Sequence, residues 1–165
     1  MSANPSDGVL GAGRYLQLRR RQNWEFVERK GVADVVVLVA ITAENEAVLV
    51  EQYREPVQAK MIEWPAGLVG DEEAPDNETM LEAAAREFEE ETGFRAGRFE
   101  ILTTGPSAGG LTSEIIAFLR PSGLERVTQG GGVEGENIRV HLVPLSQVDS
   151  WLSKRAEEGF LIDPK

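Results

Sequence analysis

The segment REFEEETGF, Arg86 to Phe94, places two glutamates where they could hold a metal ion. Glu87 and Glu91 are four residues apart, so on a helix their carboxylates lie one turn apart, at the edge of the apolar stripe centred on Phe88. Like charges repel there, and removing each from water is costly. A hard divalent cation such as Mg²⁺ or Mn²⁺ relieves both penalties and leaves coordination positions for phosphates. The spacing therefore predicts a metal site.

The other charged side chains of this segment have simpler interpretations. Glu90 stands beside the pair, and Arg86 can bind it at the helical i, i+4 distance. The remaining glutamates of the helix are assigned to its solvated face: Glu78, Glu82 and Glu89. An acidic helix with no metal is the competing interpretation of the whole segment.

A helix over residues 77–92 must carry these carboxylates. Its predicted core stripe consists of Leu81, Ala84, Ala85 and Phe88, and Gly93 marks its end. Before it, residues 1–13 predict a flexible lead-in, and residues 15–30 a strand pair with a bend near Asn23. Two β-branched segments, 32–42 and 47–54, predict central strands buried on both faces.

Residues 61–75 predict a short strand that runs into a long loop, and loops of this length are usually functional. Strands are expected within 98–104, 113–120 and 137–145, with a glycine-rich loop over 129–136. A last helix is expected from Ser146, its N-cap, to about Glu158. Strands on either side of one strong helix predict a single α/β domain, residues 14–165, with helices on the faces of a mixed sheet.

Composition excludes several classes of protein. Among 165 residues, 17 Lys and Arg stand against 28 Asp and Glu, a formal net charge of −11, which argues against nucleic-acid or anionic-membrane binding. There is no cysteine, so disulfide scaffolds and thiolate chemistry are excluded and a reducing cytoplasm is expected. Residues 1–8, MSANPSDG, lack the basic and apolar regions expected of a signal peptide, and the longest apolar stretch, Val32 to Ile41, is too short to span a bilayer.

REFEEETGF fits the pattern R-E-U-x-E-E-x-G-U, where U is a bulky apolar residue, and the segment EWPAGL precedes it. This resembles the Nudix hydrolase family. The resemblance implies an α/β/α sandwich with a mixed sheet, preceded by N-terminal antiparallel strands, that hydrolyses a nucleoside diphosphate linked to another group. It also implies Mg²⁺ as cofactor, with Mn²⁺ as a substitute, held by Glu87, Glu91 and the main-chain carbonyl of Ala66, with Glu90 nearby as a catalytic residue.

The first half of the family pattern, G-x5-E-x7-R, does not fit directly. Gly67 with Glu73 keeps the first spacing, but twelve residues then separate Glu73 from Arg86. Glu78 keeps the second spacing, but the glycine position is then Glu72. The preferred alignment uses Gly67 and Glu73, with a five-residue insertion before the helix.

Flanking segments resemble the ADP-ribose pyrophosphatase subfamily. WEFVER implies that Trp24 stacks on adenine, Glu25 contacts the base and Arg29 reaches the phosphates; EQYREP implies that Arg54 approaches a phosphate. EWPAGL matches a further segment of the subfamily, and PSAGGLTSE resembles another, P-S-P-G-G-T-S-E, with Ala108 in place of the second proline and Leu111 additional. In a regular strand Trp24 and Arg29 would lie on opposite faces unless a bend intervenes, and a Trp24 that fills the core is the alternative.

The loop QGGGVEGENIRVHLV resembles the E-x-E-x-I-R-V-H segment that carries the catalytic base and a further metal contact. Glu134 and Glu136 match the two acids, and Glu136 is also assigned to the metal. Three consecutive glycines predict a mobile loop that brings in the base; a solvated acidic loop is the alternative. The lone histidine, His141, and the tryptophans Trp64 and Trp151 are predicted to be packing residues.

The resulting prediction is an Mg²⁺-dependent enzyme that cleaves ADP-ribose to AMP and ribose 5-phosphate. The alternatives are another nucleotide substrate (GDP-mannose, UDP-glucose or a dinucleoside polyphosphate), a Nudix module that binds its ligand without cleaving it, or a structural acidic domain. The resemblance further implies a homodimer in which the N-terminal strands help to build the partner's site.

Overall fold

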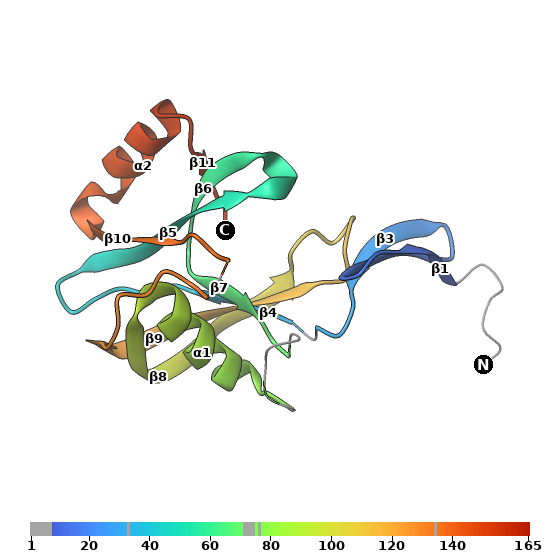
Figure 1. Cartoon of the computed structure of the whole chain (residues 1–165), viewed down its shortest axis with the longest axis horizontal. Coiled ribbons are helices and arrows are strands. Elements are labelled where there is room, and N and C mark those ends of the chain that lie inside the picture. Colours follow the sequence, from blue (N-terminus) through green and yellow to red (C-terminus); the bar gives the residue numbers. More distant parts are fainter. Residues whose placement is uncertain (1–7, 33, 71–74, 76, 134) are drawn as a thin grey trace.

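A computed structural model of the chain describes residues 8–32, 34–70, 75, 77–133 and 135–165. Figure 1 shows a body of strands with one helix on each side and a small sheet that projects from it. The strands are β1 Gly8–Ala12, β2 Leu16–Arg21, β3 Trp24–Arg29, β4 Val35–Leu38, β5 Glu46–Arg54, β6 Ala59–Glu63, β7 Ala66–Leu68, β8 Phe94–Pro106, β9 Ile115–Arg126, β10 Arg139–Pro144 and β11 Leu161–Ile162. The helices are α1 Met80–Thr92 and α2 Val148–Glu157, and two 3₁₀ turns are η1 Glu55–Val57 and η2 Leu145–Gln147.

The body contains two four-stranded mixed sheets. One has the order β7-β4-β9-β8, in which β4 runs parallel to β9 and the other neighbours are antiparallel. The second has the order β10-β5-β6-β11, in which only β11 and β6 are parallel. The predicted α/β sandwich with mixed strands is therefore confirmed.

Each helix covers its own hydrophobic core. Phe88 of α1 packs with residues of β4, β5 and β9, including Val36, Val48 and Leu119. On the other side, Trp151 of α2 packs against a cluster that includes Leu49 and Ile62. The central strands β4 and β5 are buried along most of their length, as their β-branched sequences predict.

The N-terminal sheet, β1-β2-β3, is antiparallel and stands apart from the body (Figure 1). The β2–β3 hairpin turns at Gln22 and Asn23, as predicted. Gly8–Ala12 were expected in a flexible lead-in but form strand β1, because β2 offers them a pairing edge. The backbone N–H of Val27 donates to the carbonyl of Leu111, 2.8 Å away, and so connects this sheet to the body.

Helix α1 begins and ends with strong local signals. Thr79 and Glu82 form a reciprocal capping box, and Gly93 ends the helix in the left-handed conformation, φ 75°. The buried face differs from the predicted stripe, because Leu81 and Ala85 are exposed whereas Ala83 and Thr92 are buried. The alanines on both sides of Phe88 made two orientations of the helix about its axis compatible with the sequence pattern. Packing against the sheet selects the orientation that buries Ala83 and not Ala85.

The C-terminal helix starts later than predicted. Leu145–Gln147 form a 3₁₀ turn, so Gln147 takes the N-cap position of α2 and Ser146 caps nothing. Among the described residues, no helix combines the length and apolarity needed to cross a membrane.

Candidate active site

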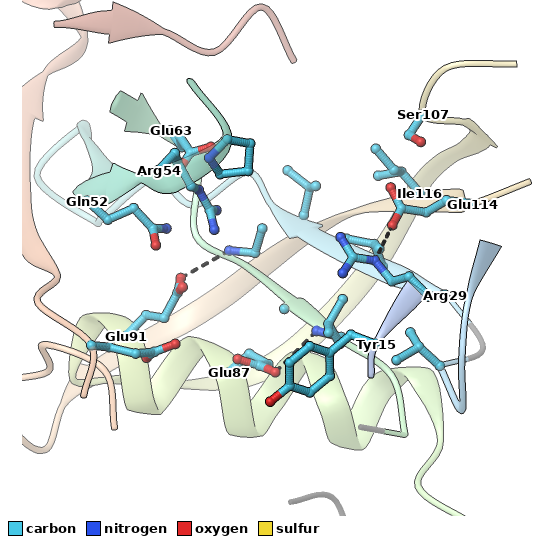
Figure 2. A pocket seen from close by; sticks show the side chains of 18 of the residues that line it. Tyr15, Arg29, Gln52, Arg54, Glu63, Glu87, Glu91, Ser107, Glu114 and Ile116 are labelled. Atoms are coloured by element: carbon cyan, nitrogen blue, oxygen red, sulfur yellow. Dashed lines mark hydrogen bonds and ion pairs between the residues drawn. The ribbon is translucent and has the colours of Figure 1, made fainter. Parts of the chain in front are cut away.

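A cleft of about 1490 Å³ lies between α1, the two body sheets and the base of the N-terminal sheet. Figure 2 shows Glu87 and Glu91 reaching into it from α1, with Arg54 and Glu63 on one wall and the pair Arg29 and Glu114 on another. Drug-sized ligand pockets measure roughly 300–1,000 Å³. The cleft is therefore large enough for an extended ligand.

The two predicted metal ligands are held by the adjoining strand β7. The backbone N–H of Ala66 donates to Glu91 Oε2 at 3.0 Å, and that of Leu68 donates to Glu87 Oε1 at 3.2 Å. A Cβ atom on Gly67 would lie closer than 3.0 Å to three atoms of the Glu87 side chain. A glycine is thus required where β7 and α1 approach each other.

Both carboxyl groups are strongly desolvated. Burial raises the pKa of Glu91 to about 8, against the Ala66 N–H that lowers it, and the neighbouring charges of Glu87 and Glu136 raise it further. Burial also raises the pKa of Glu87 to about 7, against the lowering effect of the Arg86 guanidinium. The predicted conflict between two half-buried like charges is therefore present in the folded chain.

Arg86 binds three glutamates near the start of α1, and not only the predicted Glu90. Its guanidinium contacts Glu90 Oε2 at 3.3 Å, as predicted, and also Glu87 Oε1 at 3.0 Å. It binds Glu78 at 2.8 Å, and the Glu78 side chain is only 2% exposed. This Arg86 guanidinium holds the pKa of Glu78 below its usual range.

Glu78 was assigned to the solvated face, and that assignment is wrong. The residue precedes the helix, so the loop before α1 places it and the helical periodicity does not apply. Glu78 also keeps the seven-residue spacing to Arg86 that the family pattern requires, which supports the alignment that was not preferred. Glu73, the preferred residue, lies outside the described residues.

Two arginines supply positive charge to an acidic cleft. Arg54 of β5 pairs with the buried Glu63 at 2.9 Å, and its charge also lowers the pKa of Glu91. Arg29 of β3 pairs with Glu114 at 2.6 Å across the junction between the N-terminal sheet and the body. Sequence reasoning assigned no function to Glu63 or Glu114, although both stand in segments that it had singled out, EWPAGL and PSAGGLTSE.

Trp24 and Glu25 do not line this cleft. Trp24 is 65% exposed, beside the tip of the β2–β3 hairpin. Arg29 lies five residues further along the same strand, roughly 16 Å at the usual rise, and does line the cleft. Of the four predicted substrate-binding residues, a single chain therefore brings Arg29 and Arg54 to the cleft but not Trp24 or Glu25. Tyr15 also lines the cleft, although no sequence motif indicated it.

Glu136 lines the cleft, and its carboxylate accepts the backbone N–H of Val133 at 3.1 Å. Glu134, the other candidate base, lies outside the described residues. His141 pairs with Glu51 at 3.0 Å and contacts the ring of Trp151, on the α2 side of the sheet. His141 and Trp151 thus pack against each other, as predicted, whereas Trp64 packs against the Leu49 and Ile62 cluster and also lines the cleft.

The donor set fits a Mg²⁺ ion in part. In the portion of the chain that the structure describes, no three acidic or histidine side chains are grouped closely enough to hold a metal. Mg²⁺ is nevertheless commonly bound through one or two carboxylates, with water and substrate phosphates as the other ligands. The desolvated pair Glu87 and Glu91 meets that smaller requirement.

Comparison with known proteins points in the same direction. The model of the NUDIX domain family matches residues 32–161. A methanol dehydrogenase activator of Bacillus methanolicus is 35% identical over 111 residues, 67% of this chain and 57% of the relative. An ADP-ribose pyrophosphatase of Bacillus subtilis is 33% identical over 92 residues, 56% of this chain and 45% of the relative.

The chain thus spans about half the length of these two relatives. Among solved structures, one titled as an ADP compounds hydrolase superposes with a TM-score of 0.67 at 19% identity. The superposition covers 93% of this chain and 86% of the other and shows that the fold is shared.

Proposed function

The chain belongs to the Nudix family, and from that premise we propose that it is an Mg²⁺-dependent hydrolase that cleaves ADP-ribose to AMP and ribose 5-phosphate. One observation carries the proposal. Two desolvated carboxylates, Glu87 and Glu91, lie one helical turn apart in a cleft whose other walls present Arg54 and Arg29. A diphosphate needs cations on more than one side, and this cleft can supply them.

The proposed division of labour follows from the positions of the side chains. Glu87 and Glu91, with the Ala66 carbonyl, would hold Mg²⁺, which when bound would supply positive charge that neutralises the diphosphate. Glu136 lines the same cleft but is not grouped with this pair, so it would become a further ligand only by moving toward the bound ion. Arg54 and Arg29 bind phosphate oxygens at the opposite walls. Glu63 and Glu114 hold these two guanidinium groups in place.

Hydrolysis then requires one bond to form and one to break. The oxygen of a water molecule attacks a phosphorus, the bridging P–O bond breaks, and the bridging oxygen leaves with the other phosphate. Glu136 accepts the proton of the attacking water, and Glu134 is the alternative base. Glu90, bound by Arg86, lies at the rim of the same cleft.

The choice of ADP-ribose is supported by the names of relatives and by the resemblance of WEFVER, EQYREP and EWPAGL to that subfamily. The same resemblance supports a homodimer. Trp24 and Glu25 of one protomer would then contact the base in the cleft of the other, which is compatible with their distance from the cleft of their own chain.

The test is incubation with ADP-ribose and Mg²⁺ and identification of the products by mass, with the variants Glu91→Gln and Glu89→Gln in parallel. Glu89 stands on the same helix but pairs with Arg95 outside the cleft, so it is the matched control. A metal contact worth several kcal/mol corresponds to roughly a 100-fold loss of kcat or more. We expect that loss in Glu91→Gln and wild-type turnover in Glu89→Gln.

Other outcomes discriminate among the alternatives. Turnover of GDP-mannose, UDP-glucose or a dinucleoside polyphosphate in place of ADP-ribose would keep the chemistry and change the substrate. Tight binding of ADP-ribose without cleavage of any of these compounds would identify a ligand-sensing module and overturn the proposal.

A further inference from the structure

The glycine-rich loop after β9 is bonded to the end of α1. The last carbonyl groups of a helix have no partner within it. Here the backbone N–H of Gly132 donates to the carbonyl of Glu90 at 3.0 Å, and that of Gly131 to the carbonyl of Glu91 at 2.9 Å. The loop therefore provides hydrogen-bond donors for the backbone carbonyl groups of Glu90 and Glu91, and both of these residues also line the cleft.

Two glycines make this approach possible. A Cβ atom on Gly130 would lie closer than 3.0 Å to backbone atoms of Thr92 and Gly93, and a Cβ on Gly93 would lie equally close to the backbone of Thr128 and Gly130. Both residues also have a positive φ, 68° and 75°. Because the obstructing atoms are backbone, a side chain at either position would push the loop away from the helix.

This contact determines where Glu136 lies. A tight turn follows Gly132, in which the backbone N–H of Glu136 donates to the carbonyl of Val133 at 3.0 Å and its carboxylate accepts the Val133 N–H. The Glu136 side chain packs directly over Gly132, where a Cβ would be closer than 3.0 Å to it. Glu136 and Glu91 both line the cleft, where the charge of Glu136 raises the pKa of Glu91.

We propose that Gly93 and Gly130–Gly132 are positioning residues: they form a backbone anchor that fixes Glu136 relative to Glu91. This inference rests on the proposed function, because it assigns the glycines to the hydrolytic reaction. From sequence, the three consecutive glycines, Gly130–Gly132, predicted a mobile loop. In this proposal they instead let the loop pack against the backbone at the end of α1.

The first test compares Gly130→Ala with Gly123→Ala. Both glycines have nearly the same φ, 68° and 66°, but a Cβ on Gly123 meets nothing closer than 3.6 Å. The control therefore carries the same backbone strain without the collision. Since a displacement of about 1 Å can cost roughly 100-fold in rate, we expect Gly130→Ala to lose 10- to 100-fold in kcat with little change in KM.

A double-mutant cycle shows whether the anchor acts through Glu136. If it does, Gly130→Ala causes no further loss of kcat in a Glu136→Gln background. Multiplicative losses, or an equal loss in Gly123→Ala, would overturn the proposal. Should Gly130→Ala fail to fold, amide exchange of Gly131 and Gly132 in the wild type still tests the anchor.

A readout without substrate separates this inference from the proposed function. Amide hydrogen exchange of Gly131 and Gly132 should be slow in the wild type and fast in Gly130→Ala. Fast exchange of both amides in the wild type would overturn the anchor. Slow exchange in a wild-type protein without turnover would instead preserve the anchor and contradict the proposed hydrolysis.

Discussion

Glu87 and Glu91 are held in a state that is unfavourable without a cation. Their pKa values are raised to about 7 and about 8 because burial penalises the charged form, and among the described residues one backbone N–H and, to a smaller extent, the charge of Arg54 act against this for Glu91. A chain that merely required a stable helix could place alanine or leucine at these positions. Retaining two desolvated carboxylates is characteristic of a functional site.

This electrostatic arrangement predicts how stability depends on pH. In the unfolded chain both groups titrate near 4.5, whereas in the folded chain they titrate near 7 and 8. Between these values the unfolded chain has released protons that the folded chain retains, so the free energy of unfolding falls as pH rises. We expect the metal-free protein to lose melting temperature from pH 5 to pH 8, and Glu91→Gln to lose less.

Thermal unfolding at several pH values, with and without Mg²⁺, tests this prediction. Mg²⁺ should raise the melting temperature most at pH 8, because it binds the deprotonated pair of the folded state. Identical pH slopes for the wild type and Glu91→Gln would show that Glu91 is not responsible.

At the scale of elements, the site depends on how closely β7 approaches α1. The three atoms nearest to a methyl group at Gly67 all belong to the Glu87 side chain, so we expect that side chain to move and the helix to stay. Mutations that displace the groups orienting a metal ligand typically weaken metal binding roughly 10-fold or more. We therefore expect Gly67→Ala to raise the Mg²⁺ concentration needed for half-maximal activity by roughly 10-fold or more. Its effect on the free energy of unfolding should be small.

Gly105→Ala is the control for this prediction, because Gly105 also lies in a strand and a Cβ there meets nothing within 4 Å. Metal titrations of activity and melting curves of the three proteins are sufficient. A Gly67→Ala protein with unchanged Mg²⁺ dependence would mean that Glu87 is not a ligand.

Elements with strong local signals were predictable from sequence. The helical periodicity and Gly93 made α1 clear, and the i, i+4 spacing alone placed Glu87 and Glu91 together, whereas the Thr79–Glu82 capping box was not anticipated. Contacts between distant segments were not predictable. Nothing local shows that Arg86 reaches back to Glu78, or that Gly131 and Gly132 bond to the end of α1, because loop paths and not periodicity bring these residues together.

At the scale of the whole molecule, the N-terminal sheet differs from the rest of the chain. Residues 8–32 contain six Lys and Arg against two Glu, in a protein whose net charge is −11. The same strands expose large apolar side chains: Val9, Leu10, Leu16, Leu18 and Trp24. A basic and apolar sheet that projects from an acidic body is suited to a second copy of this chain.

Subunit complementation tests whether Trp24 acts in the partner's cleft. Trp24→Ala and Glu91→Gln each disable a different part of the site, and mixing the two proteins under conditions that allow exchange forms heterodimers. If Trp24 acts across the interface, one site of each heterodimer has both residues intact. Half of the dimers then carry one working site of two, so activity should recover to about a quarter of the wild-type value.

If Trp24 acts within its own chain, every site in the mixture carries one defect and no activity returns. Measuring the mass in solution decides the remaining case, because a protein that stays at 18.1 kDa cannot share sites. Trp24 is exposed beside the hairpin tip and away from the cleft of its own chain. Recovery of activity in the mixture would explain this position, because Trp24 would then act in the cleft of the other subunit.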